Sequence, residues 1–544
     1  MNDNSPQQRE MNRDQTQDVK KQAPGSGKDE RIESKAAVKN GVARMILVVL
    51  SILIEVIVIF LLLHYAGSRA GWIYVVLHII SILLVLVIYG SHKTASIRMT
   101  WIMLIMLVPV VGTVLYFLIG LNGHTLKMRR RYVEIDKILL PMLPDNKMAE
   151  HRMKSQYGRF GGVVHYIRKN AGYPVYENTK VTYYDDGLKG FEAQKEELAK
   201  AERFIFMEYH AIEDAESWHE MLEILEERAK AGVDVRVFYD DMGSLGFVNM
   251  DFVKRTRAHG LQCRVFNPFI PGLNLFLNNR DHRKITVIDG KVGFTGGYNL
   301  ANEYFHRTEP YGFWKDTGIR LEGDAVQSLT AIFLEMWNAI SEHDEDDRDF
   351  SQYLVSPPVE GAEGFVQPYA DSPMDGIAVG EDVYMSIAEA AQNYVWYITP
   401  YLIITDEMNH ALCLAAMRGV DVRIITPGIP DKKMVYSLTR SYYNGLARRG
   451  VRIFEFTPGF CHAKMCVSDD MVATCGTINM DYRSLYHHFE NGCLYAGNDA
   501  VMETKYDFIR TFDQCREVTD YYASGRGAFL RFGQMLLRLA APLM

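Results

Sequence analysis

The chain has 544 residues and a formal net charge of −8 at pH 7. This length exceeds what one hydrophobic core supports and predicts several domains. The acidic balance argues against a general nucleic-acid-binding protein, which would carry a basic surface. The seven cysteines are scattered, with no CxxC pair and no metal-like spacing, and this predicts free thiols in a reducing compartment.

Residues 1–42 form a polar leader rich in Asn, Gln, Lys, Asp and Glu. Such a composition cannot bury enough apolar surface to order itself. The leader also lacks the form of a signal peptide, because an apolar run begins only after about forty residues. We therefore expect a disordered cytoplasmic tail.

Three apolar runs follow, in a predicted membrane region over residues 43–120. The first two runs are long enough to cross a bilayer, and they predict spanning helices over 45–65 and 71–90. The third run, over 100–119, has Pro109 at its centre with a glycine close by. Glu55 in the first run and His78 in the second lie at similar depth. Either they pair between the helices, or a protonated Glu55 bonds to a neighbouring helix.

Basic residues flank these runs and orient them. They are Lys35, Lys39 and Arg44 before the first run, Lys93 and Arg98 after the second, and Lys127, Arg129, Arg130 and Arg131 after the third. The positive-inside rule places all three groups in the cytoplasm. The third run meets this demand if it enters the bilayer and returns, breaking at Pro109 and Gly112. The alternative is a third full crossing, with the rest of the chain outside.

The remainder of the chain contains an internal repeat. After a basic linker over 121–160, we predict two lobes, over 161–345 and 366–525, joined by a linker over 346–365. The repeat pairs Gly232–Val237 with Gly419–Ile424, Gly260–Phe266 with Gly450–Phe454, and Phe204–Tyr209 with Val395–Tyr401. Each half alternates short apolar strands with helical stretches. The predicted fold class is α/β, with two similar lobes, each a sheet flanked by helices, related by a pseudo-twofold axis.

Each lobe carries one copy of the pattern HxKxxxxD followed by GxxN. The first copy is His282, Lys284, Asp289 and Asn299, and the second is His462, Lys464, Asp469 and Asn479. Apolar residues fill the space between Lys and Asp in both copies, which predicts a buried strand. Residues two apart in a strand point the same way, so His and Lys of each copy should project into one cleft. One HxK arises often by chance, but two complete copies are a strong signal.

The paired motifs resemble those of the phospholipase D superfamily, and with the apolar N-terminal region the chain is similar to bacterial cardiolipin synthases. The resemblance implies a transferase that joins two phosphatidylglycerol molecules into cardiolipin and releases glycerol. It implies a phosphatidyl-histidine intermediate and a place in the bacterial cell membrane, with cytoplasmic lobes. It implies no cofactor, no metal and no nucleic-acid partner.

The residue types fit transfer of a phosphodiester. Lys284 and Lys464 supply positive charge for the non-bridging phosphate oxygens, and Asn299 and Asn479 supply neutral donors. One imidazole attacks phosphorus while the other protonates the departing alkoxide from the opposite side. The resemblance makes His282 the nucleophile and His462 the acid.

Carboxylates are needed to orient the imidazoles and to stabilise their cationic form. Glu303 and Glu490 are the candidates. Asp289 and Asp469 belong to the motif and count among the catalytic residues, or else they brace the strand and its lysine. No metal is expected, because the remaining histidines near the motifs, His306, His487 and His488, lack a companion cluster. Many superfamily members have Ser where this chain has Gly297 and Thr477, so a hydroxyl contact from the first motif is in doubt.

Two further segments leave alternatives open. The apolar loop Asn267–Asn279 either dips into a lipid interface or packs on the other lobe. The tail over 526–544 has apolar residues at spacings of three and four among arginines, which predicts a basic amphipathic helix. That helix lies on an anionic membrane surface or closes the second lobe. For the whole protein, a hydrolytic phospholipase D is the nearest alternative function, and a membrane-tethered nuclease, disfavoured by the acidic charge, is a further one.

Overall fold

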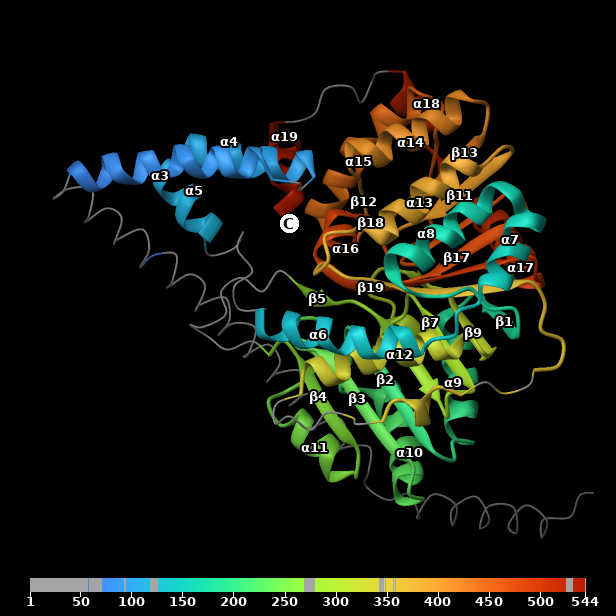
Figure 1. Cartoon of the computed structure of the whole chain (residues 1–544). Coiled ribbons are helices and arrows are strands. Elements are labelled where there is room, and N and C mark those ends of the chain that lie inside the picture. The colour runs from blue at the N-terminus through green and yellow to red at the C-terminus, as the bar shows by residue number, and fades with distance from the viewer. Residues whose placement is uncertain are drawn as a thin grey trace, which may run out of the picture.

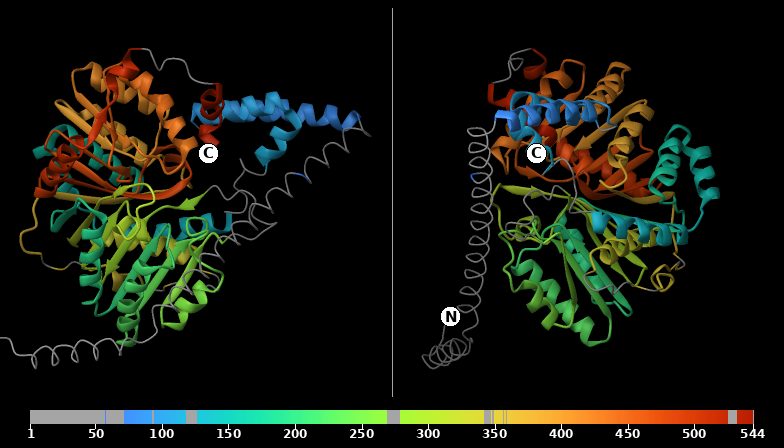
Figure 2. Two further views of the ribbon diagram at one scale, coloured as in Figure 1. Left: turned by 180° about the vertical axis from the view of Figure 1, so that it is seen from behind. Right: turned by 60° about the vertical axis from the view of Figure 1, so that its left-hand side comes forward.

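The computed structural model describes residues 71–543, apart from 92–93, 118–125, 269–278, 342–346, 348, 356, 358 and 525–531, together with residue 57. Its body consists of two α/β lobes, one above the other in Figure 1. The views of Figure 2 show a group of N-terminal helices extending to one side of this body, close to the C-terminus. Apart from residue 57, the predicted first span at 45–65 lies outside the described residues, as do Glu55 and most of the loop Asn267–Asn279.

The first lobe is built on a seven-stranded sheet of order β1-β9-β7-β6-β2-β3-β4. Its strands are β1 (Thr179–Tyr184), β2 (Phe204–Tyr209), β3 (Asp234–Asp240), β4 (Gln262–Phe266), β6 (Lys284–Ile288), β7 (Val292–Gly296) and β9 (Gly318–Gly323). The helices around it are α9 (Gly187–Leu198), α10 (Glu216–Lys230), α11 (Phe252–Ala258) and α12 (Val326–Ala339). All six residues of β2 are buried, as expected for a central strand covered on both faces.

The second lobe repeats this order as β10-β19-β17-β16-β11-β13-β14 and adds β20 at the edge. Its strands are β10 (Phe365–Asp371), β11 (Tyr394–Ile398), β13 (Asp421–Pro427), β14 (Arg452–Phe456), β16 (Met465–Ser468), β17 (Val472–Gly476), β19 (His488–Ala496) and β20 (Cys515–Glu517). Its helices are α13 (Val379–Ala390), α14 (Asp406–Met417), α15 (Lys433–Ala447), α16 (Tyr482–Tyr486), α17 (Asp499–Phe512) and α18 (Thr519–Ala523). The shared strand order confirms the predicted α/β class and its duplication.

Two short ladders connect the lobes. Strand β5 (Arg280–Asp281) of the first lobe runs parallel to β19 of the second, and β8 (Phe313–Lys315) runs parallel to β15 (Gly459–Cys461). A third short pair, β12 (Leu402–Ile403) with β18 (Met480–Asp481), stays within the second lobe. The two connecting ladders correspond to each other in the repeat. In each of them, the strand that immediately precedes an HxK motif in one lobe pairs with a strand of the other lobe.

Short 3-10 helices complete the lobes: η3 (Leu140–Met142), η4 (Gly158–Phe160), η5 (Asn302–Phe305), η6 (Ser351–Tyr353) and η7 (Ala541–Leu543). Helix α6 (Leu126–Leu139) packs along α12, whereas α7 (Lys147–Tyr157) packs on α8 (Gly161–Ala171). Helix α8 falls in the range predicted for the first lobe, yet it packs against α13 and β10 of the second. Every residue of α12 is buried, because it lies between the first sheet, α6 and β10.

The N-terminal helices α3 (Gly71–Tyr89), α4 (Ala95–Leu107) and α5 (Pro109–Leu115) pack on one another. Helix α4 ends where Pro109 begins α5, and Gly112 of α5 lies against the backbone of Leu104 and Ile105, where a Cβ would meet atoms at 2.7 to 2.9 Å. The apolar run over 100–119 therefore folds back on itself. Within the described ranges, no helix combines the length and the hydropathy needed to cross a membrane.

The tail forms helix α19 (Phe532–Ala540) followed by η7. Helix α19 packs on α15, where the Arg538 guanidinium lies 4.2 Å from the centre of the Tyr442 ring. Thr100 of α4 donates to the carbonyl of Leu539, and Met535 and Leu536 remain exposed. The helix thus closes the second lobe on one side and presents apolar side chains on the other.

Candidate active site

The two connecting ladders bring each motif histidine to the opposite lobe. In the first, Asp281 pairs with Phe489, and the His282 backbone N–H donates to the Phe489 carbonyl at 2.9 Å. In the second, Cys461 pairs with Lys315, and the His462 N–H donates to the Lys315 carbonyl at 2.7 Å. Because paired residues in neighbouring strands lie side by side, the next residue on each partner strand is placed beside a histidine. These residues are Glu490 and Asp316.

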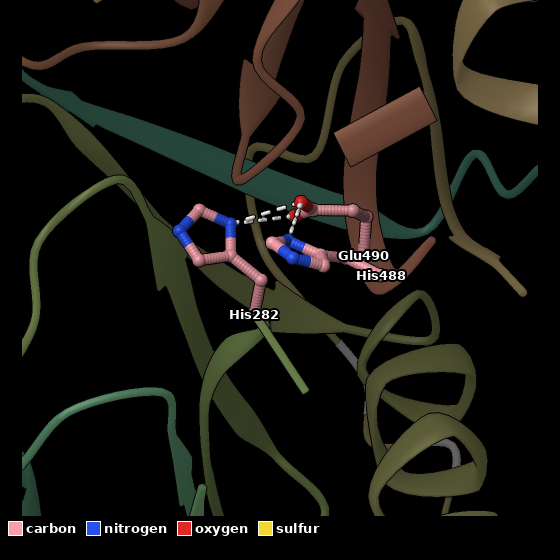
Figure 3. A group of neighbouring side chains, drawn as sticks. All are labelled: His282, His488 and Glu490. Atoms are coloured by element: carbon pink, nitrogen blue, oxygen red, sulfur yellow. Dashed lines mark hydrogen bonds and ion pairs between the residues drawn. The ribbon is translucent and has the colours of Figure 1, made fainter. Parts of the chain in front are cut away.

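Both of these carboxylates bind the imidazole beside them. Nδ1 of His282 lies 2.9 Å from each carboxylate oxygen of Glu490, as Figure 3 shows. Nδ1 of His462 lies 2.7 Å from Oδ2 of Asp316. Each pair crosses from one lobe to the other. A carboxylate on Nδ1 fixes the ring and leaves Nε2 as the nitrogen that can meet a substrate.

The histidines face one cavity of about 660 Å³ between the lobes. His282 and His462 both contribute to its wall, as do Asn299 and Asn479. The other lining residues are His210, Ala211, Met242, Gly243, Phe247, Arg280, Glu303, Tyr304, Tyr311, Trp314, Tyr401, Ile403, Asp431, Lys432, Val435, Asp481, Tyr482, Arg483, His488 and Ala541. Aromatic rings and charged groups therefore surround both imidazoles, which suits a ligand with an anionic centre and apolar parts.

Burial controls the protonation of the motif residues. Desolvation, with the charges of Lys284 and Lys464, holds the pKa of His282 well below its usual range. Desolvation and Lys464 lower the pKa of His462 to about 4, although Asp316 opposes them. Burial also lowers the pKa of Lys284 to about 7 and that of Lys464 to about 8. Both imidazoles are thus neutral at pH 7, with a ring nitrogen available for nucleophilic attack.

The lysines lie against the histidines of their own motifs. Lys284 Nζ donates to the His282 carbonyl, and Lys464 Nζ lies 2.8 Å from Nδ1 of His462. Asn299 is held by the Ala211 N–H and donates to the Tyr304 hydroxyl at 2.8 Å, whereas the buried Oδ1 of Asn479 has no hydrogen-bond partner among the described residues. The structure thus brings the histidines, lysines and asparagines of the two motifs close together, but only the histidines and asparagines line the cavity, whereas both lysines are buried.

The motif aspartates lie at the far end of the motif strands. Asp289 accepts hydrogen bonds from the N–H groups of Glu202, Arg203 and Phe204, at the start of β2. Asp469 accepts the equivalent three from Gln392, Asn393 and Tyr394. Neither side chain lines the cavity. Of the two predicted roles, the structure supports bracing the strand and not direct catalysis.

The prediction that Glu303 orients an imidazole is wrong. Glu303 lines the cavity, but Asp316 holds the Nδ1 of His462. Burial, with Glu213 and Asp431 nearby, raises the pKa of Glu303 to about 7. Sequence reasoning missed Asp316, although the repeat contains a signal for it: Asp316-Thr317-Gly318 matches Glu490-Asn491-Gly492. In each lobe the glycine of this triplet pairs with the motif glycine.

His488 has a companion cluster after all. Its ring centre lies 5.5 Å from that of His282, and the Glu490 carboxylate faces both rings in Figure 3. Nitrogen and oxygen atoms of these three residues lie within 4.8 Å of one another, a spacing that could hold a metal ion. An ion there would compete for the same Nδ1 that binds Glu490, so we assign the set to orientation of His282. By contrast, His487 contacts the Pro542 carbonyl and His306 contacts Asp186, both outside this cluster.

Comparison with known proteins agrees with this geometry. The family model described as the phospholipase D-like domain of cardiolipin synthase matches residues 195–337 and 384–515, and one described as phospholipase D-nuclease N-terminal matches 72–120. An uncharacterized protein of Streptococcus mutans is 41% identical over 85% of this chain and 99% of its own. A cardiolipin synthase of Geobacillus kaustophilus is 31% identical over 88% of this chain and 95% of its own. The crystal structure of phosphatidylserine synthase from Haemophilus influenzae shares the fold, with a TM-score of 0.52 and 16% identity over 67% of this chain and 93% of that one.

Proposed function

The chain belongs to the phospholipase D-like cardiolipin synthase family and is a phosphatidyltransferase, and we propose that it condenses two phosphatidylglycerol molecules into cardiolipin and glycerol. The observation that carries the proposal is the pair of imidazoles in one cavity, each held at Nδ1 by a carboxylate and each beside a lysine. Such a site can attack a phosphodiester from one side and protonate its leaving group on the other.

The reaction proceeds in two steps. Nε2 of His282 attacks phosphorus of the first lipid, the bond from phosphorus to the glycerol oxygen breaks, and protonated His462 gives its proton to that oxygen. A hydroxyl of the second phosphatidylglycerol then gives its proton to His462 and attacks phosphorus, and the phosphorus–nitrogen bond breaks. Lys284 and Lys464 stabilise the charge on the non-bridging oxygens in both steps. An incoming phosphodiester anion favours the protonated form of His462, and this offsets the low pKa of its imidazole in the empty site.

The function of the N-terminal region is part of the proposal. We propose that the predicted membrane region over 43–120 holds the lobes at the cytoplasmic face of the bacterial membrane. Two observations support this. The family model for the N-terminal region covers 72–120, and large apolar side chains of α3 such as Leu86 and Val87 are exposed, at 63% and 67%. An exposed apolar helix is otherwise a liability.

We expect an alcohol on a lipid, and not water, to resolve the intermediate. Aromatic side chains around His462, among them Tyr304 and Trp314, limit water on the side from which an acceptor would reach the phosphohistidine at His282, where bulk water would otherwise compete strongly. With labelled phosphatidylglycerol, the purified protein should produce cardiolipin and glycerol. Because one phosphodiester replaces another, added glycerol should reverse the reaction. Phosphatidic acid as the main product, with no effect of glycerol, would instead identify a hydrolase.

The rate should fall on the alkaline side as the lysines lose their protons. In the free enzyme Lys284 and Lys464 are charged only below their pKa values of about 7 and about 8. Deprotonation of His462, with a pKa of about 4 in the empty site, already lowers kcat/KM above that pH. We therefore expect a steeper decrease of kcat/KM as pH rises through the range of the two lysines, with an apparent pKa that belongs to the pair. A bound phosphodiester stabilises the ammonium form, so the same limb should lie at higher pH in the profile of kcat. Profiles of kcat and kcat/KM from pH 5 to 10 test this; alkaline limbs that coincide would contradict it.

A further inference from the structure

Three cationic side chains that line the cavity lie outside the motifs: Arg280, Lys432 and Arg483. Arg483, in α16, lines the cavity beside the histidines. Among the described residues its guanidinium makes no hydrogen bond or ion pair, and its Nε is buried without a partner. Burial lowers the pKa of this guanidinium and Arg280 lowers it further, although the carboxylates of Asp481 and Asp240 oppose them in part. Arg483 is half-buried, and a guanidinium withdrawn from water with no carboxylate in contact is stabilised when an anion joins it.

The nearby carboxylates are already engaged. Asp481, two residues before Arg483, accepts hydrogen bonds from the backbone N–H groups of Arg483 and Ser484 at 2.8 and 3.0 Å. Asp240 lies 3.3 Å from Nη1 of Arg280 and also accepts the N–H groups of Gly243 and Asp281. Arg280 therefore has a carboxylate in contact, whereas Arg483 directs its charge toward the cavity with no such partner in the described chain.

The two lobes carry opposite charges at the position of Arg483. Arg483 follows Asn479 by the same spacing with which Glu303 follows Asn299, so the two occupy corresponding positions in the two lobes. Both line the cavity. Arg483 acts electrostatically on His488, which stands beside His282, while Tyr304, next to Glu303, contacts His462. The pseudo-twofold cavity thus has a cationic wall near His282 and an acidic wall near His462.

We propose that Arg483 is an anion-binding site for a lipid phosphodiester, separate from the two motif lysines. The planar guanidinium presents paired N–H donors that match the oxygens of a phosphodiester. The inference rests on the proposed function in so far as the anion belongs to a phospholipid. Either of two phosphates has the required chemistry, that of the lipid being transferred or that of the lipid that accepts it.

Binding is tested without turnover in a His282→Ala background, by the thermal shift that dihexanoyl-phosphatidylglycerol produces. Loss of a charge-assisted hydrogen-bonded pair should raise the half-saturating lipid concentration about tenfold or more in Arg483→Gln. Arg483→Lys, which keeps the charge but not the paired donors, should give a smaller increase. Arg452→Gln is the matched control, because its guanidinium pairs with Glu517 outside the cavity, and it should bind like the parent.

Two activity assays, made in enzyme that retains His282 and is therefore active, identify which phosphate Arg483 binds. Incorporation of labelled glycerol into phosphatidylglycerol requires one lipid and a neutral acceptor, whereas cardiolipin formation requires two lipids. If Arg483 binds the accepting lipid, Arg483→Gln should impair cardiolipin formation about tenfold more than glycerol exchange. If it binds the transferred phosphate, both rates should fall equally.

The proposal is overturned if Arg483→Gln and Arg483→Lys bind the lipid within about twofold of the parent. Folding is checked by the melting temperature without lipid, and Arg483→Lys decides the question if Arg483→Gln does not fold. If the wild-type enzyme neither forms cardiolipin nor exchanges glycerol, the proposed function is refuted. The binding measurement would still test whether Arg483 binds the lipid phosphodiester.

Discussion

Replacement of His282 by Ala should lower turnover by about 10⁴-fold or more and abolish the phosphatidyl-enzyme intermediate. The neutral imidazole, held by Glu490 at Nδ1, is the group whose Nε2 would form the bond to phosphorus. Without it, only water or the acceptor can attack, with no activated nucleophile. Radiolabelled phosphatidylglycerol followed by an alkaline denaturing quench tests this, because phosphohistidine survives base and is lost in acid.

His462→Ala provides the matched comparison. It retains the nucleophile and loses the acid, so it should still form labelled enzyme from a lipid whose leaving group is p-nitrophenol, which departs without protonation. Its loss of rate with phosphatidylglycerol should be as severe as that of His282→Ala, since nucleophile and acid work as one unit. Labelled protein in the His282→Ala variant would reverse the two assignments.

The second large effect is expected at the carboxylates that cross between the lobes. Asp316→Asn and Glu490→Gln should each lower kcat by about 10²- to 10⁴-fold, with little change in stability. A neutral amide cannot stabilise an imidazolium, and it can hold the ring in the wrong tautomer. Because Asp316 binds His462, Asp316→Asn should recover most with a p-nitrophenol leaving group. Glu490→Gln, which acts on His282, should not recover.

Glu303→Gln is the control for this pair. Glu303 lines the same cavity and is half-buried, but it binds neither imidazole, so its replacement should have a smaller effect on kcat. The melting temperature of each variant separates loss of chemistry from loss of folding. A severe loss in Glu303→Gln with near-normal rates in Asp316→Asn would restore Glu303 as the orienting group.

The sequence predicted the parts of the fold that depend on short-range patterns. Apolar residues between Lys284 and Asp289 gave a buried strand, and β6 is entirely buried. The Gly-Val-Asp repeats correctly marked β3 and β13. The partner of His462 depends instead on the pairing of β8 with β15, two strands far apart in the chain. No local periodicity encodes that pairing. Glu303 was chosen for its closeness to the motif in sequence, whereas Asp316 is close only after the lobes have met.

The crossed carboxylates constrain how this enzyme arose. Each lobe holds one histidine together with the acid that serves the other histidine, so a protein with a single lobe would contain neither complete pair. A single-lobe protein of that kind could form the histidine–carboxylate pairs only as a twofold dimer, in which the carboxylate of each subunit binds the histidine of the other. Two copies joined in one chain do not need to be identical. Corresponding positions can then differ, and here one carries Glu303 and the other Arg483.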